Sequence, residues 1–135
     1  MIDKKHIGYA QPAFLWDVEK GRIAFFAKVI GLTDPIHTDE AAAKAAGYRG
    51  IVAPPTFIFG APGDSGETMK LIETLEIDLG KVLHGEQRFD YHAPVCAGDT
   101  LRFESRVSDI YDKKGGALEF VVNDTKVTNQ LGEHV

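Results

Sequence analysis

The stretch LRFESRV, residues 101–107, decides the fold class of this chain. Leu101, Phe103 and Val107 share one phase of a two-residue period, while Arg102, Glu104 and Arg106 occupy the other. This alternation predicts a β-strand with one face buried and the other face in water. The stretch KKGG, residues 113–116, is typical of a hairpin turn, so an antiparallel strand is expected directly after it.

The returning strand is predicted over residues 118–127, and its apolar positions change phase partway along. Either a β-bulge or a strand buried on both faces would produce that change. An earlier strand is predicted over Gln87–His92, followed by a turn over Pro94–Asp99. The second half of the chain is therefore expected to form an antiparallel sheet.

The first half of the chain carries helical patterns. Apolar residues recur at the spacing of one helix face in Asp17–Ile30, and shorter helices are expected over Asp39–Ala46 and Ser65–Glu76. The expected N-caps are Asp17 and Thr38, and the expected stops are Gly31 and Gly47. Helices packed on one face of an antiparallel sheet define an α+β domain.

Composition limits the class of protein. The chain has 135 residues, and its 15 Lys and Arg against 20 Asp and Glu give a net charge of −5. An acidic chain lacks the basic surface of a general nucleic-acid binder. Cys96 is the only cysteine, and no apolar run has the length of about 20 residues that a membrane span needs. We therefore expect one soluble, cytoplasmic domain over residues 1–135, with no nucleic-acid or membrane partner.

Three short motifs point to a family when they are taken in order. They are APPTF at residues 53–57, HGEQ at 84–87 and AGDT at 97–100. Together they resemble the N-terminal, MaoC-like half of the (R)-specific enoyl-thioester hydratase and 3-hydroxyacyl dehydratase family, over residues 10–132. The resemblance implies a hotdog fold, in which an antiparallel sheet wraps around a long helix and two such units pair their sheets. It also implies a further strand after residue 133, which is short or missing here.

The same resemblance locates a catalytic motif, Asp-x-Asn-Pro-x-His, that this chain has altered. His37 and Pro35 match the motif, but Leu32 stands at the aspartate position and Asp34 at the asparagine position. The family's oxyanion-hole glycine matches Pro55, and proline has no N–H to donate. These departures are typical of the family's non-catalytic halves.

Two candidate catalytic remnants keep alternative interpretations. His37 is either a surviving acid/base or a histidine that holds a loop by hydrogen bonds. Asp34 is either a displaced base paired with His37 or an aspartate that caps the turn before Pro35. Cys96 lies in an apolar turn and is expected to be a buried structural thiol.

The resemblance also implies contacts with an acyl thioester, carried by coenzyme A or by an acyl carrier protein. The substrate-binding candidates are Pro54, Pro55, Thr56, Phe57, His84 and Gly85. His84 has a second interpretation, as a loop histidine bonded to neighbouring backbone. No set of His, Cys and carboxylate residues has metal-ligand spacing, so we expect no metal and no cofactor.

Three functions are compatible with these observations. The leading one is a non-catalytic hotdog subunit of a hydro-lyase, which completes the acyl tunnel of a second hotdog subunit that carries the intact motif. The alternative is a homodimeric module that binds acyl thioesters without turnover. A thioesterase or a divergent hydratase that uses His37 with Asp34 or Asp39 ranks last, because no activated nucleophile is evident.

Overall fold

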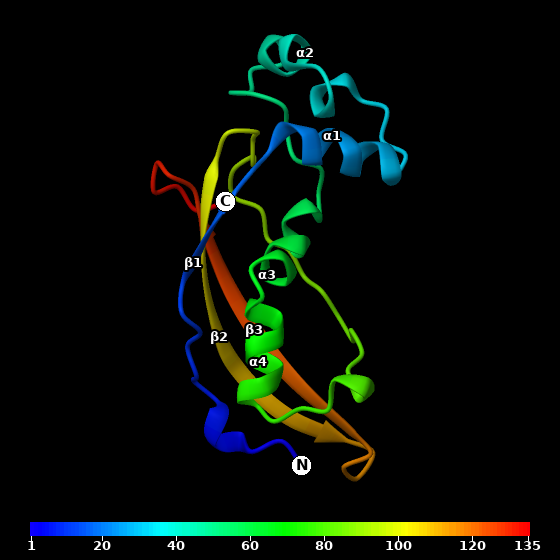
Figure 1. Ribbon diagram of the computed structural model, residues 1–135, viewed down its shortest axis with the longest axis vertical. Coiled ribbons are helices and arrows are strands. Elements are labelled where there is room, and N and C mark those ends of the chain that lie inside the picture. Colours follow the sequence, from blue (N-terminus) through cyan, green and yellow to red (C-terminus); the bar gives the residue numbers. More distant parts are fainter.

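The sheet of the molecule has three antiparallel strands. In the computed structural model, which describes residues 1–135, they are β1 (Phe14–Asp17), β2 (Thr100–Lys113) and β3 (Leu118–Thr128), in the order β1-β2-β3. β2 and β3 form one long curved hairpin, and β1 pairs with the start of β2 (Figure 1). The strand predicted over 101–107 and its returning partner are confirmed.

The hairpin explains the change of phase in the sequence. Lys114, Gly115 and Gly116 all have positive φ, so the KKGG stretch forms the expected turn. The register shifts between Val107 and Asp109, where Ser108 has no partner on β3. The irregularity is thus a bulge, and it lies on the outgoing strand rather than on the returning one.

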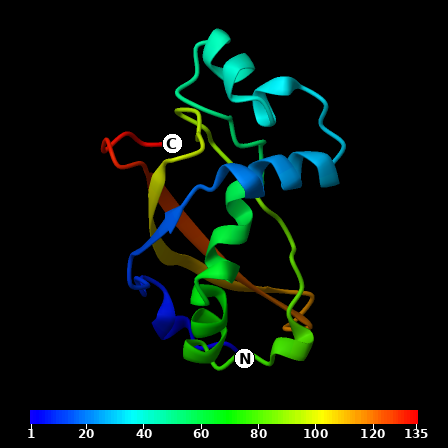
Figure 2. The same ribbon diagram turned by 45° about the horizontal axis from the view of Figure 1, so that its top comes forward.

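A column of short helices covers the concave face of the sheet (Figures 1 and 2). It consists of η3 (Phe57–Gly60), α3 (Ala61–Asp64) and α4 (Glu67–Thr74). The helix expected over Ser65–Glu76 begins later, because Gly66 has a φ of 79° and separates α3 from α4. The sheet therefore wraps around a broken column instead of one long helix.

Two further helices form one end of the molecule (Figure 1). α1 spans Lys20–Val29, α2 spans Glu40–Ala45, and the short η2 (Pro35–His37) lies between them. Gly31 and Gly47 have positive φ and end the two helices as expected.

Both predicted N-caps are wrong by a small shift. Asp17 is the last residue of β1, where it accepts a hydrogen bond from the Thr100 hydroxyl at 2.7 Å, so α1 begins three residues later. The N-cap of α2 is Asp39 instead of Thr38, and it accepts the N–H groups of Ala41 and Ala42. A carboxylate accepts two orphan amides more readily than a single hydroxyl does, which explains the choice.

The strand predicted over Gln87–His92 is also wrong. The 82–92 segment follows η4 (Leu79–Lys81) and is extended, but it makes no ladder with the sheet. Its charged side chains are exposed, so no buried face holds it to a neighbouring strand. The short η1 (Lys4–His6) completes the elements, and none of the helices is long and apolar enough to span a membrane.

The core lies where α1, η3 and the start of the sheet meet. Its buried members are Trp16, Val18, Ile23, Ile51, Phe57, Ala61, Val95, Leu101, Phe103, Val127 and Val135. A smaller cluster of Leu75, Val107 and Ile110 packs the end of α4 on the middle of β2. Cys96 is a buried free thiol, as expected.

One buried carboxylate joins three parts of the chain around this core. Asp99 is 1% exposed and accepts two hydrogen bonds from Arg49, one from the Cys96 N–H at 2.9 Å and one from the Gln130 amide at 3.0 Å. Burial works against the charge of this carboxyl. The hydrogen bonds from Arg49, Cys96 and Gln130 outweigh the burial, and the pKa of Asp99 lies below its ordinary value of 3.8.

We expect Asp99→Asn to lower the free energy of unfolding at pH 7 by about 2 kcal/mol, because the charge-assisted hydrogen bonds from Arg49, Cys96 and Gln130 would weaken while the half-exposed Arg49 stays solvated. Because the folded-state pKa is lowered, the contribution of Asp99 is complete above about pH 5 and is lost as the pH falls through the folded pKa. Urea unfolding at pH 7 and pH 3.5 measures both effects, with exposed Asp124→Asn as the control. An equal effect of Asp99→Asn at both pH values would contradict the ionic role.

Candidate functional site

Two segments far apart in the sequence form the walls of a pocket. The first wall is residues 51–55, and the second wall is residues 91–97. The Ala53 N–H donates to the Val95 carbonyl, and the Ala97 N–H donates to the Ile51 carbonyl, both at 2.8 Å. Val52 and Cys96 face each other in an isolated antiparallel bridge. Asp99 lies at the end of this short ribbon and holds Arg49, which precedes the first wall.

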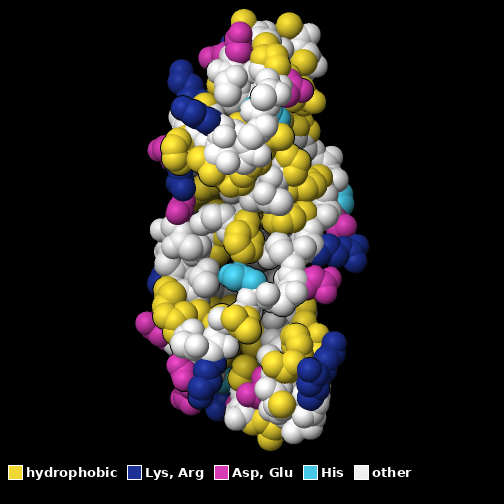
Figure 3. All heavy atoms as spheres, turned by 90° about the vertical axis from the view of Figure 1, so that its right-hand side faces the viewer, with side chains coloured by type: hydrophobic (Ala, Val, Ile, Leu, Met, Phe, Trp, Pro, Cys, Tyr) yellow, Lys and Arg dark blue, Asp and Glu magenta, His cyan; other side chains and the backbone are white.

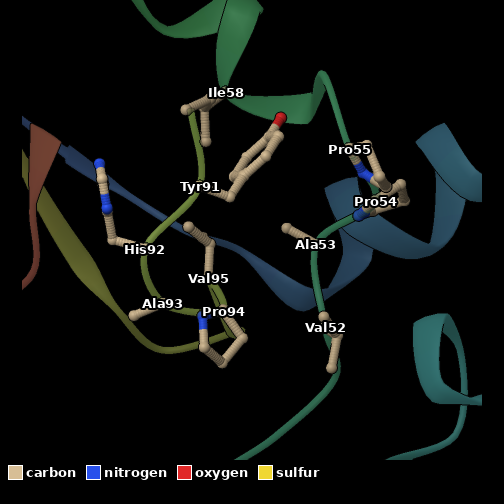
Figure 4. Close-up of a pocket in the computed structure, with 10 residues that line it drawn as sticks. All are labelled: Val52, Ala53, Pro54, Pro55, Ile58, Tyr91, His92, Ala93, Pro94 and Val95. Atoms are coloured by element: carbon tan, nitrogen blue, oxygen red, sulfur yellow. The ribbon is translucent and has the colours of Figure 1, made fainter. Parts of the chain in front are cut away.

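The pocket between these walls has a volume of about 330 Å³ and is mainly apolar (Figure 4). Its lining residues are Val52, Ala53, Pro54, Pro55, Ile58, Tyr91, His92, Ala93, Pro94 and Val95. Tyr91 and His92 are the only lining residues with polar side chains. A pocket of this size and composition suits the hydrocarbon part of a small ligand.

The first wall ends in a strained turn. Pro54 and Pro55 are followed by Thr56, which has a φ of 73° although its side chain is β-branched. The Phe57 N–H donates to the Pro54 carbonyl at 3.1 Å and closes the turn into η3. The Thr56 N–H donates to the Tyr91 hydroxyl at 2.9 Å, so the turn is tied to the opposite wall of the pocket.

His37 lies behind the first wall and not in the pocket. It is 8% exposed, and its Nδ1 lies 2.7 Å from the Val52 carbonyl, which requires a proton on Nδ1. The Val52 N–H donates to the Ile36 carbonyl at 3.0 Å, and the Asp34 carboxylate accepts the Ile36 N–H at 3.1 Å. In this arrangement His37 braces the wall through Nδ1, and Asp34 caps η2.

Leu32 lies in a different hollow, on the outer side of α1. That hollow has a volume of about 640 Å³ and is lined by Ala24, Phe25, Lys28, Gly31, Leu32, Thr33 and Thr38. The structure therefore places Leu32, His37 and Pro55 in three separate surroundings. Of these three residues, only Pro55 lines the apolar pocket.

The other predicted substrate contacts lie in three places: the pocket lining, the core and the surface. Pro54 and Pro55 line the pocket, while Phe57 is buried in the core against Trp16 with ring centroids 5.3 Å apart. His84 packs edge-to-face on Phe59 at 5.3 Å, outside the pocket lining.

Gly85 passes close to β3. A Cβ built on Gly85 would lie 3.6 Å from the Phe120 ring, an ordinary van der Waals distance, so the 82–92 segment passes beside the hairpin without requiring glycine at this position. Sequence reasoning did not single out Tyr91, the residue that faces the Thr56 turn. Its only signal was an aromatic residue at the end of a segment predicted to be a strand.

The side of the molecule that carries the 82–92 segment exposes a band of apolar side chains (Figure 3). Charged side chains gather along the edges of this band, and a histidine lies beside a hollow near its centre. Leu83 is 87% exposed, and Val82, Phe59 and Leu118 are also exposed. Contiguous exposed apolar surface of this kind is typical of a protein interface. No group of three His, Cys, Asp or Glu side chains is arranged to hold a metal ion.

Comparison with known proteins identifies the family. A model of the FAS1-like dehydratase domain region matches residues 5–135. A UPF0336 protein of Streptomyces avermitilis is 34% identical over 135 residues, which cover 99% of this chain and 89% of that protein. The chain belongs to the FAS1-like dehydratase region family.

Two solved structures are similar to the whole fold. A C-terminally truncated HadBC complex, a 3R-hydroxyacyl-ACP dehydratase from Mycobacterium tuberculosis, gives a TM-score of 0.76 at 30% identity and covers 96% of this chain and 90% of its own. A MaoC-like dehydratase gives a TM-score of 0.82 at 25% identity, again over 96% of this chain. This chain spans only 39% of the length of that second protein. The MaoC-like hotdog fold implied by the three motifs is confirmed.

We expect Thr56→Gly to raise the free energy of unfolding by about 1 kcal/mol, because glycine adopts a φ of 73° without the strain of a β-branched side chain. The midpoint of urea unfolding measures the change. Thr38→Gly is the matched control, since Thr38 has an ordinary φ of −135° and glycine there should lower stability by up to about 1 kcal/mol. A Thr56→Gly variant that unfolds earlier than the parent would show that the turn is not strained.

Proposed function

We propose that this chain is a non-catalytic hotdog subunit of a hydro-lyase acting on 2-enoyl and 3-hydroxyacyl thioesters. Its apolar pocket completes the acyl-binding tunnel, and a second hotdog subunit supplies the catalytic aspartate and histidine. The observation that carries this proposal is the pairing of a dehydratase-type fold with a pocket that has no carboxylate in its lining and whose one histidine, His92, is turned away from Tyr91 and Pro55.

Hydration of a 2-enoyl thioester requires a base for the attacking water and donors for the developing enolate oxygen. Pro54 and Pro55 have no N–H, and Ala53 already donates to Val95. The His92 ring stacks on His134 with centroids 4.1 Å apart, and Figure 4 shows it directed away from Tyr91 and Pro55. The chain directs no base at a bound water, which supports a non-catalytic role for its pocket.

A second hotdog subunit is supported by two features of the surface. The strand order leaves β3 at the edge of the sheet, where only His134 pairs back on Thr128. Unpaired edges favour association, and the exposed apolar band lies on the side of the 82–92 segment. The similar HadBC structure is described as a complex, which agrees with this arrangement.

Mixing this chain with a hotdog protein that carries an intact Asp-x-Asn-Pro-x-His motif is expected to give crotonyl-CoA hydratase activity, measured by the loss of enoyl absorbance. The chain alone should be inactive, because no carboxylate lines its pocket and the His92 ring stacks on His134. The partner alone and the partner with a heat-denatured chain are the controls. Activity of the pure chain at the rate of a complete hydratase would contradict the proposal.

We expect Leu83→Lys to weaken association through the apolar band by about tenfold, because it places a charge where an 87% exposed leucine would be buried. Size-exclusion chromatography with light scattering measures the dissociation constant of the homo-oligomer or of the mixed complex. Leu131→Lys is the matched control, since Leu131 is also exposed but lies in the turn after β3. Equal weakening by both variants, or a stable monomer of the parent that binds no partner, would exclude this interface.

A further inference from the structure

We infer that the Tyr91 hydroxyl is the hydrogen-bond donor that recognises the acyl carbonyl oxygen in this pocket. The inference rests on the proposed function and assigns the polar contact that the first wall lacks. It depends on what each backbone amide of the first wall does, and on where the only hydroxyl in the lining points.

The first wall has no amide left for a ligand. The Val52 and Ala53 N–H groups donate to the Ile36 and Val95 carbonyls, and the two prolines that follow have no N–H. The next amide is that of Thr56, and it donates to the Tyr91 oxygen at 2.9 Å. A carbonyl entering the pocket therefore finds no free amide along this wall.

The tyrosine is held in position from two sides. Its ring stacks on Phe89 with centroids 5.7 Å apart and an angle of 12° between the planes. Figure 4 shows that the ring extends from the second wall across the pocket, with its hydroxyl directed toward the turn after Pro55. The Thr56 N–H fixes the oxygen of this hydroxyl as an acceptor.

A hydroxyl that accepts one hydrogen bond still has its own hydrogen to donate. No protein acceptor takes the hydrogen of Tyr91, because its only hydrogen bond is the one from Thr56. Accepting from the amide polarises the O–H and strengthens it as a donor. The Thr56 N–H would thus donate to the Tyr91 hydroxyl, and this hydroxyl would donate to the ligand carbonyl, beside apolar walls that contact the hydrocarbon.

The strained conformation of Thr56 is part of this arrangement. A β-branched residue in the left-handed region is rare and persists where the surrounding structure requires it. In this conformation the Thr56 N–H donates to the Tyr91 hydroxyl. The Trp16 and Phe26 rings hold Phe57, the next residue, in the core and keep the turn in this form.

The test compares a thioester with a thioether that lacks the carbonyl. Calorimetry would measure binding of hexanoyl-CoA and of S-hexyl-CoA to the parent and to Tyr91→Phe, with folding checked by circular dichroism. The parent should prefer the thioester by about five- to tenfold, the effect of one hydrogen bond. Tyr91→Phe should lose that preference and leave the thioether affinity unchanged.

Tyr111→Phe is the matched control, because Tyr111 stacks on Phe120 in the hairpin and does not line the pocket. It should bind both probes as the parent does. If Tyr91→Phe loses affinity equally for both probes, the residue is only a packing contact. If Tyr91→Phe binds the thioester more tightly than the parent does, the hydroxyl only blocks the Thr56 amide. Either result overturns this inference and leaves the proposed function intact. A parent that binds neither probe overturns both.

Discussion

The hydrogen bonds of Asp99 hold together the parts of the chain that make the pocket. This carboxylate fastens Arg49 ahead of the first wall, Cys96 in the second wall and Gln130 in the turn after β3. Because each of these segments is short and irregular, none has a helix or sheet of its own to fix it. A buried charge with four donors supplies that order, and its low pKa shows that the donors outweigh the cost of burial.

The paired prolines determine what the pocket offers to a ligand. They give the first wall a stiff, apolar surface and remove two amides from it. The next N–H after them is that of Thr56, which has a strained conformation and donates to the Tyr91 hydroxyl. The polar function of the wall therefore shifts to the opposite side of the pocket, where Tyr91 lies.

The sequence predicted the fold class more completely than the site. The alternation in 101–107, the KKGG turn and the stops at Gly31 and Gly47 are local signals, and the structure has all of them. The prediction of a strand over Gln87–His92 was wrong because a strand exists only when a neighbouring strand pairs with it. The local sequence pattern does not reveal that pairing. Tyr91 was missed for a related reason, since its importance depends on a contact with a residue 35 positions earlier.

His37 shows why a motif residue is not by itself a catalyst. Its Nδ1 proton is committed to the Val52 carbonyl, and that bond joins η2 to the first wall of the pocket. A histidine in this position contributes to the shape of the pocket whether or not an aspartate stands at position 32. The bracing bond does not involve position 32, because Leu32 lies in the hollow outside α1. The shape of the pocket therefore does not depend on an aspartate at that position, as the proposed division of labour between two hotdog subunits requires.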